Sequence, residues 1–305
     1  MSKYRVWFLL VVCNLFWAGN YVFGKYVVAE MSPLWITFSR WAVAAFVLLA
    51  IAHFHEKPDW KSVVKQWPAF IILGLLGFVG YNMVLYTALD YTSSTNAALV
   101  SAFGPGVMAI FSLFMLKEGI SKLQITGIGL SLLGVLVVLT KGNILQVFQV
   151  AYNRGDVLML AAVVMWTLYS IMGKKLNGIK PITATAMAAL FAVVMMAPFA
   201  FAQGIDIANI SSLAMIGISY MILFPSIGSF VFWNISVREI GASQAGIFLN
   251  LIPVFTALIS WTLGERITLS QIGGGCLVFI GVYLTTGMLE RNLAAKNVLE
   301  KQAEK

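Results

Sequence analysis

Two copies of one pattern run head to tail through this chain, and this duplication constrains its fold more than any other feature. The spacing between matched residues changes only from 149 to 147 along the chain, as short loop insertions would cause. Whatever the first copy folds into, the second copy should build again. The matched positions are Trp17 and Trp166, Asn20 and Tyr169, Tyr21 and Ser170, Gly24 and Gly173, Lys25 and Lys174, segments 97–105 and 245–253, Gln124 and Gln271, Gly127 and Gly274, and Gly134 and Gly281.

Long apolar stretches place this repeated unit in a membrane. Of the 305 residues, 60% are hydrophobic and only 10% are charged, whereas about 25% of the residues in a soluble domain are charged. Each stretch approaches the roughly 20 residues that cross a bilayer as a helix. We therefore predict an all-α polytopic membrane protein with ten transmembrane helices. The expected spans are 6–28, 34–53, 69–89, 94–115, 122–140, 156–173, 182–202, 213–236, 241–263 and 270–289.

Five spans in each copy turn the second copy upside down relative to the first. Inverted repeats of this kind are the construction of many secondary transporters, so transport is the leading hypothesis. We expect a first repeat over 1–141, an outer linker over 142–154, a second repeat over 155–289 and a charged cytoplasmic tail over 290–305.

The net charge of +8 follows the expected topology. Most lysines and arginines fall in the loops on the side of the N-terminus, which is the bias that orients membrane proteins. We expect a multi-pass protein of the cytoplasmic membrane with both termini in the cytoplasm. The basic residues therefore imply the lipid bilayer as a partner and no nucleic acid.

Several motifs resemble one known family. Asn96 begins a segment that leads to Pro105 and then Glu118, and Gln244 begins its echo, which leads to Pro253 and then to Gly264 and Glu265. With the glycine-rich fifth and tenth spans, this order is similar to the EamA family of the drug/metabolite transporter superfamily over residues 6–289. The resemblance implies a ten-helix carrier for small metabolites, often an exporter, with a central cavity between the repeats.

Two polar and aromatic helix faces are candidates for lining the substrate path. Trp17, Asn20 and Tyr21 share one face of the first span at helical spacing, and their counterparts Trp166, Tyr169 and Ser170 share one face of the sixth. Lipid cannot satisfy hydrogen-bonding groups, so these faces should meet protein or water. The alternative is that the aromatic residues belong to the interfacial belt.

Further candidates on other spans offer hydrogen-bond donors, acceptors and flat apolar rings, which together suit an amphipathic solute. The alternative for each serine or asparagine is a helix-to-helix hydrogen bond. These candidates are Tyr81, Asn82 and Tyr86 on the third span, Asn96 on the fourth, Ser229 and Trp233 on the eighth, and Asn250 on the ninth.

Arg40 is a charged residue inside the second span. An arginine within a membrane is costly and commonly faces a cavity or an ionic partner. One interpretation is that it binds a carboxylate or phosphate of the substrate. The alternative is that it snorkels to the interface or pairs with Glu30 or Asp90.

Pro105 and Pro253 occupy equivalent positions in the fourth and ninth spans. Proline removes a backbone donor and disturbs the preceding turn, so both helices should bend there. Matched bends are candidate gating points, and fixed structural bends are the alternative.

Our functional expectation is a secondary transporter that moves a small metabolite, such as an amino acid or a related compound, outward by alternating access of the two repeats. A multidrug or toxic-compound exporter is the alternative. An intramembrane enzyme is disfavoured, because the only histidines are His53 and His55 and no zinc-protease spacing occurs. We expect no catalytic residue, metal or cofactor. The sequence names neither a coupling ion nor an oligomeric state.

Overall fold

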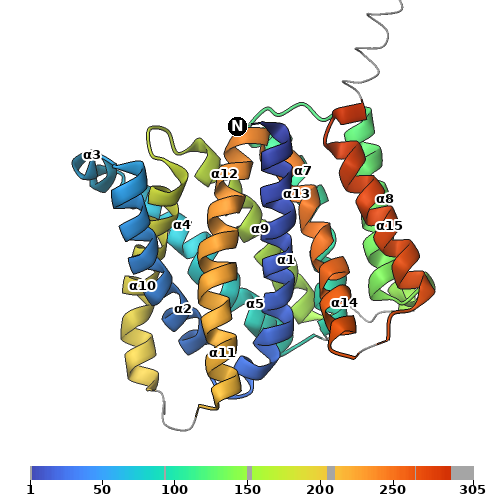
Figure 1. The fold of residues 1–305 in the computed structure, drawn as a ribbon, viewed down its shortest axis with the longest axis horizontal. Coiled ribbons are helices and arrows are strands. Elements are labelled where there is room, and N and C mark those ends of the chain that lie inside the picture. The colour runs from blue at the N-terminus through green and yellow to red at the C-terminus, as the bar shows by residue number, and fades with distance from the viewer. Residues whose placement is uncertain (1, 93, 150–152, 205–209, 265, 290–305) are drawn as a thin grey trace, which may run out of the picture.

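The computed structural model describes residues 2–92, 94–149, 153–204, 210–264 and 266–289. Helix accounts for 85% of it and the described residues form no strand. Among them, nine helices are long and apolar enough to cross a membrane, and the 17-residue α15 is a shorter tenth. This confirms the predicted helical membrane class (Figure 1). The predicted tail over 290–305 and residues 150–152 of the linker lie outside the described ranges.

The first repeat forms five spans, several of them built from consecutive helical segments. The segments are α1 (Lys3–Val28), α2 (Pro33–Ile51) with the π-helix η1 (Ala52–Glu56), the short α3 (Trp60–Lys65), α4 (Trp67–Leu73) with the π-helix η2 (Gly74–Gly80) and α5 (Tyr81–Leu89), α6 (Ser94–Ser101) with α7 (Gly104–Met115), and α8 (Lys122–Leu139).

The second repeat follows the 3-10 helix η3 (Ile144–Gln149) and has the same order. Its segments are α9 (Arg154–Lys175), α10 (Pro181–Gln203), α11 (Ser212–Met221) with the π-helix η5 (Ile222–Ser229) and α12 (Phe230–Ile240), α13 (Ala242–Gly246) with the 3-10 helix η6 (Ile247–Asn250) and α14 (Leu251–Thr262), and α15 (Leu269–Thr285).

Local sequence signals set the helix starts in equivalent places of both repeats. Ser121 and Gln124 form a capping box at the start of α8, and Thr268 and Gln271 form the equivalent box at the start of α15. In each box, side chains satisfy backbone N–H groups that have no partner within the helix.

The contact between α8 and α15 shows the inversion directly. A Cβ atom on Gly127 would lie 2.6 Å from the carbonyl oxygen of Gly281, and one on Gly134 would lie 2.6 Å from that of Gly274. Because Gly127 is equivalent to Gly274 and Gly134 to Gly281, each half presents the same surface to the other. The two helices therefore cross about an approximate two-fold axis, as the inverted repeats predict, and only glycine permits so close an approach.

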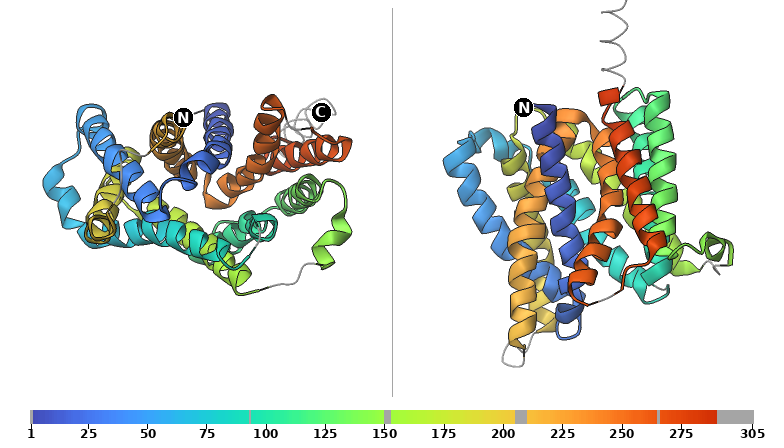
Figure 2. Two further views of the ribbon diagram at one scale, coloured as in Figure 1. Left: turned by 90° about the horizontal axis from the view of Figure 1, so that it is seen from below. Right: turned by 45° about the vertical axis from the view of Figure 1, so that its right-hand side comes forward.

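The two repeats interleave rather than sit side by side. α1 of the first repeat packs against α11, α12 and α14 of the second, and α9 of the second packs against α5, α6 and α7 of the first. The α8–α15 pair closes one edge of the molecule and the α2–α10 pair the opposite edge (Figure 2). The first span of each repeat thus lies among spans of the other repeat.

The third and eighth spans contain π-helical segments that hydropathy alone does not reveal. η2 begins at Gly74 and η5 begins at Ile222, which are equivalent positions of the two repeats. Pro225 inside η5 removes one backbone donor, which favours a change of hydrogen-bond register. π-Helical segments within helices are frequent at functional sites.

Both prolines singled out in the sequence stand just after an interruption of their span. Pro105 is in the first turn of α7, after the break that follows α6. Pro253 is in the first turn of α14, immediately after η6. The first turn tolerates proline because its N–H groups have no partner within the helix. Their role as gating points stays a prediction.

Candidate binding site

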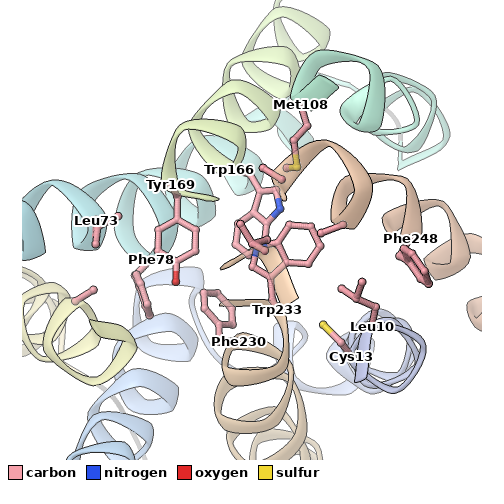
Figure 3. Close-up of a cluster of buried hydrophobic side chains, with 14 of the residues drawn as sticks. Leu10, Cys13, Leu73, Phe78, Met108, Trp166, Tyr169, Phe230, Trp233 and Phe248 are labelled. Atoms are coloured by element: carbon pink, nitrogen blue, oxygen red, sulfur yellow. The ribbon is translucent and has the colours of Figure 1, made fainter. Parts of the chain in front are cut away.

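Tryptophans from both repeats meet in the middle of the molecule. The ring centroids of Trp17 and Trp166 are 5.3 Å apart, and each lies 5.6 Å from that of Trp233. Phe230 closes the group at 5.4 Å from Trp166. Figure 3 shows the side chains from α9 and α12 converging. We call Trp17, Trp166, Phe230 and Trp233 the aromatic cluster.

Tyr81 and Tyr169 extend this cluster. Their ring centroids lie 5.5 and 5.3 Å from that of Trp166. Tyr169 and Trp233 are buried in the hydrophobic core. Of the sequence-predicted faces of the first and sixth spans, Trp17 and Trp166 therefore contact each other inside the molecule, and the role of these faces in binding stays a prediction.

Hydrogen bonds tie part of the sixth span to the eighth. The indole N–H of Trp233 donates to Ser170 Oγ at 3.0 Å, and that hydroxyl donates to the carbonyl of Trp166 at 2.9 Å. Asn234 donates to the hydroxyl oxygens of Tyr169 at 2.8 Å and Thr185 at 2.9 Å. For Ser170 these bonds match the helix-to-helix alternative. Asn234 and Thr185 were not among the predicted site residues. The signal that could have identified them is the polar Asn234 next to Trp233 in the sequence.

Two polar atoms on the helices that contribute to the aromatic cluster, α9 and α1, are buried and have no hydrogen-bond partner in the described part of the chain. They are the indole Nε1 of Trp166 and the amide Oδ1 of Asn20. Trp166 is only 9% exposed. A buried polar group without a partner costs about 1–3 kcal/mol. The donor belongs to the aromatic cluster, and the acceptor is three residues after Trp17 on α1, so it lies on the same side of that helix.

Arg40 in α2 is only 6% exposed, so protein rather than lipid covers its side chain. Its Nε donates to the hydroxyl of Ser226 in η5 at 3.1 Å, and Ser226 donates to the carbonyl of Met221 at 2.8 Å. The carboxylate of Glu30, considered as a partner from the sequence, accepts bonds from the N–H and hydroxyl of Ser211 at 2.7 and 2.6 Å.

Of the remaining candidates, three side chains make hydrogen bonds within or between helices, and one is exposed. Asn82 donates to the carbonyl of Phe78 at 2.6 Å within its own span. Ser229 donates to the carbonyl of Cys13 at 2.9 Å, and Asn250 donates to Ser131 at 2.9 Å. Tyr21 is 48% exposed. The side chains of Tyr86 and Asn96 lie outside the described part of the structure.

Within the described ranges, no group of three or more histidine, cysteine, aspartate and glutamate side chains is arranged to hold a metal ion. The site consists of aromatic surface, amides, hydroxyls and one buried guanidinium. Such groups bind and orient an amphipathic solute.

The fold and this site define a class: an integral membrane protein of two interleaved inverted repeats around an aromatic centre, as in secondary transporters. The chain belongs to the EamA-like transporter family, whose profile matches residues 5–140 and 153–287, one match in each repeat.

Relatives agree with this assignment, and a solved structure shares the fold. The chain is 30% identical over 292 residues to the uncharacterized transporter YyaM of Bacillus subtilis (strain 168), covering 95% of this chain and 96% of the relative. It is 27% identical over 281 residues to an uncharacterized transporter of Archaeoglobus fulgidus, covering 91% and 96%. A solved crystal structure shares the fold with a TM-score of 0.80 at 19% identity, covering 93% of this chain and 98% of the other.

Proposed function

We propose that this membrane transporter exports a small amphipathic metabolite across the cytoplasmic membrane by alternating access of its two repeats. The aromatic cluster carries the proposal, because it joins side chains of both repeats. Among the described residues, the indole N–H of Trp166 in this cluster and the amide oxygen of Asn20, three residues after Trp17, have no hydrogen-bond partner. The inverted construction gives this centre equivalent routes to either side of the membrane.

The chemistry of the cluster favours an amino acid or a related compound as substrate. A carboxylate or carbonyl oxygen would accept from the Trp166 N–H, and an ammonium or amino group would donate to Asn20 Oδ1. Apolar or flat parts of the solute would pack on the tryptophan rings. Arg40 supplies a positive charge for an anionic group on the eighth-span side, where it contacts Ser226.

A multidrug or toxic-compound exporter is the second candidate, favoured by the large share of ring surface in the cluster. One more distant relative is a transporter with named metabolite substrates. The chain is 25% identical over 197 residues, 62% of its length and 59% of the relative, to the S-adenosylmethionine/S-adenosylhomocysteine transporter of Chlamydia trachomatis serovar L2. Both compounds belong in a ligand panel with amino acids and hydrophobic drugs.

A thermal-shift screen of the purified protein tests the proposal, because a ligand that binds only the folded state raises its apparent stability. We expect one compound class to raise the Tm, and Trp166→Phe to weaken its binding by about tenfold through loss of one hydrogen bond. Trp35→Phe is the matched control, since Trp35 also has a buried indole N–H without a partner in the described residues but lies at the start of α2.

If the ligand-induced rise in Tm persists in Trp166→Phe but is lost in Trp35→Phe, the ligand binds outside the aromatic cluster. A panel of metabolites without any effect, with hydrophobic drugs raising the Tm, would favour the second candidate.

The orientation is tested separately. The helix ends on the side of the N-terminus carry many basic residues, including Lys3, Arg5, Lys57 and Lys61, which supports a cytoplasmic position for that side. A reporter that works only in the cytoplasm should be active when it is fused to the C-terminus, and a reporter that works only in the periplasm should be inactive there. Activity of a periplasm-dependent reporter would contradict this topology.

A further inference from the structure

An ion pair joins the two repeats at the end of the molecule where α1 begins. Glu118 follows α7 of the first repeat, and its carboxylate accepts a hydrogen bond from Nζ of Lys174 in the last turn of α9. The second carboxylate oxygen accepts from the N–H of Ser243 at 3.3 Å. Three segments, the ends of the fourth and sixth spans and the turn between the eighth and ninth, therefore meet at one carboxylate.

The turn is shaped to receive this carboxylate. Gly241 has φ +94°, and a Cβ atom there would lie 2.8–3.0 Å from the carboxylate atoms of Glu118. Only glycine adopts this backbone conformation without strain while leaving that space. The side chains of Glu118 and Lys174 are 18% and 26% exposed. The pair is thus mostly covered by protein, where a charge left without its partner is costly.

The three helices that lead to this ion pair and to the turn, α7, α9 and α12, each carry a fully buried hydroxyl. Ser112 on α7, Thr167 on α9 and Ser236 on α12 have no hydrogen-bond partner for their hydroxyls in the described part of the chain. Thr167 follows Trp166 and precedes Lys174 by two helical turns, and Ser236 follows Trp233 and precedes Gly241. Buried polar groups are normally hydrogen-bonded, and these three hydroxyls are exceptions on the helices that end at the ion pair and its turn.

The same charges occur once in each repeat. Lys25 is the sequence equivalent of Lys174, and Glu265 is the sequence equivalent of Glu118. The structure describes neither the Lys25 side chain nor Glu265, and the inference rests on the Glu118 end alone.

We propose that Glu118, Lys174 and the Gly241–Ser243 turn form a gate that closes the route between the aromatic cluster and the N-terminal end of the molecule. Ser112, Thr167 and Ser236 line the route behind the gate. The inference rests on the transport function proposed above and adds the residues that control access to its site. Opening separates Glu118 from Lys174 and Ser243 and exposes the three hydroxyls to water.

Thiol labelling tests this gate without any substrate. The reporter is Ser236→Cys in the full chain with Cys13→Ala and Cys276→Ala, reconstituted in sealed vesicles of known orientation. A membrane-impermeant maleimide should react slowly with this reporter. Glu118→Gln and Lys174→Gln should each raise the rate from the N-terminal side by about tenfold or more, which corresponds to about 1.4 kcal/mol in favour of the open state. The rate from the opposite side should not rise.

Two further variants separate gating from general destabilisation. Gly241→Ala leaves both charges in place but displaces the carboxylate, so it should also raise the labelling rate. Glu56→Gln is the matched control, because Glu56 also joins the repeats at this end, accepting N–H bonds from Ile182 and Thr183 at 3.0 and 2.7 Å, but at the α2–α10 edge. It should lower the Tm without opening the reporter.

A lower Tm with unchanged labelling in the Glu118, Lys174 and Gly241 variants would show that the ion pair only stabilises the fold, and would overturn the gate. Equal labelling in the Glu56→Gln control would overturn it as well. A ligand screen without any binder would count against the proposed substrate site, whereas the labelling result would be unaffected, so the two failures are distinguishable.

Discussion

At the scale of single residues, Arg40 is where charge and burial conflict most. Its guanidinium lies under protein in the second span and bonds to Ser226 of the eighth. A charge in this position persists when it has a partner or a function. A carboxylate-bearing substrate would give it such a function, since guanidinium and carboxylate groups form strong paired hydrogen bonds.

Arg40→Ala should abolish or strongly weaken the binding of an anionic ligand and leave a neutral ligand bound. Thermal shifts with a matched anionic and neutral pair measure the difference. Ser226→Ala is the control, because it removes the hydrogen bond to Ser226 but keeps the charge. If both ligands bind Arg40→Ala as well as the original protein, Arg40 has a structural role only.

Glu30 gives a residue-scale prediction for acid stability. The hydroxyl of Ser211, followed by its N–H, lowers the pKa of the exposed Glu30 carboxyl below its ordinary value of 4.5. A lowered folded-state pKa contributes stability above the ordinary pKa, and this contribution is lost as the pH falls through the lowered value.

The Tm of the protein should therefore fall below about pH 4.5 partly through protonation of Glu30. Glu30→Gln should have a lower Tm near neutral pH and a smaller decrease on acidification. Parallel Tm curves against pH for the two proteins would contradict a contribution from the Glu30–Ser211 contact.

For single residues, the sequence predicted the candidate side chains better than it predicted their hydrogen-bond partners. The spacing of Trp17 and Trp166 predicted two inward faces, and the structure packs these rings together. Periodicity cannot show that the Ser170 hydroxyl is engaged by Trp233 while the Trp166 N–H is unpaired. Such pairing depends on the relative height and rotation of two helices that are distant in the sequence.

At the scale of helices, α8 and α15 show how small residues set a helix contact. The Gly127–Gly281 and Gly134–Gly274 approaches leave no space for a Cβ atom. The sequence alone does not show which glycines of these two helices make the close contact. Gly129 and Gly273 lie on the same helices, yet a Cβ atom on either would meet nothing within 4 Å.

Gly134→Ala should therefore destabilise the protein by about 1–3 kcal/mol, the usual cost of overpacking. Gly129→Ala should be neutral or slightly stabilising, because alanine favours helix. Unfolding of both variants in detergent gives the comparison. Equal stability of Gly134→Ala and Gly129→Ala would rule out the close contact.

Helix boundaries were predicted within a few residues, because span length and apolar runs are local signals. The π-segments η2 and η5 were not predicted. They depend on which carbonyl each N–H selects, and side-chain polarity does not encode that choice. The break between α6 and α7 was placed only approximately by Pro105, which lies after it.

At the scale of the whole molecule, the inverted repeat was readable because five spans per copy must reverse the second copy. The sequence did not predict that spans of one repeat pack among spans of the other. The structure places α1 among α11, α12 and α14 and places α9 among α5, α6 and α7. A relative movement of the repeats would therefore rearrange the aromatic cluster, which contains side chains from α1, α9 and α12.

The central claim is that this cluster is reached from each side of the membrane in turn. The most direct measurement is the labelling of an Asn20→Cys reporter from each side of sealed vesicles, with Cys13 and Cys276 replaced by alanine and with a ligand present or absent. We predict reaction from one side in a given state, and a ligand-dependent or Glu118→Gln-dependent change in the ratio of the two rates. A reporter that reacts from neither side in any condition, or from both sides at one unchanging ratio, would contradict alternating access.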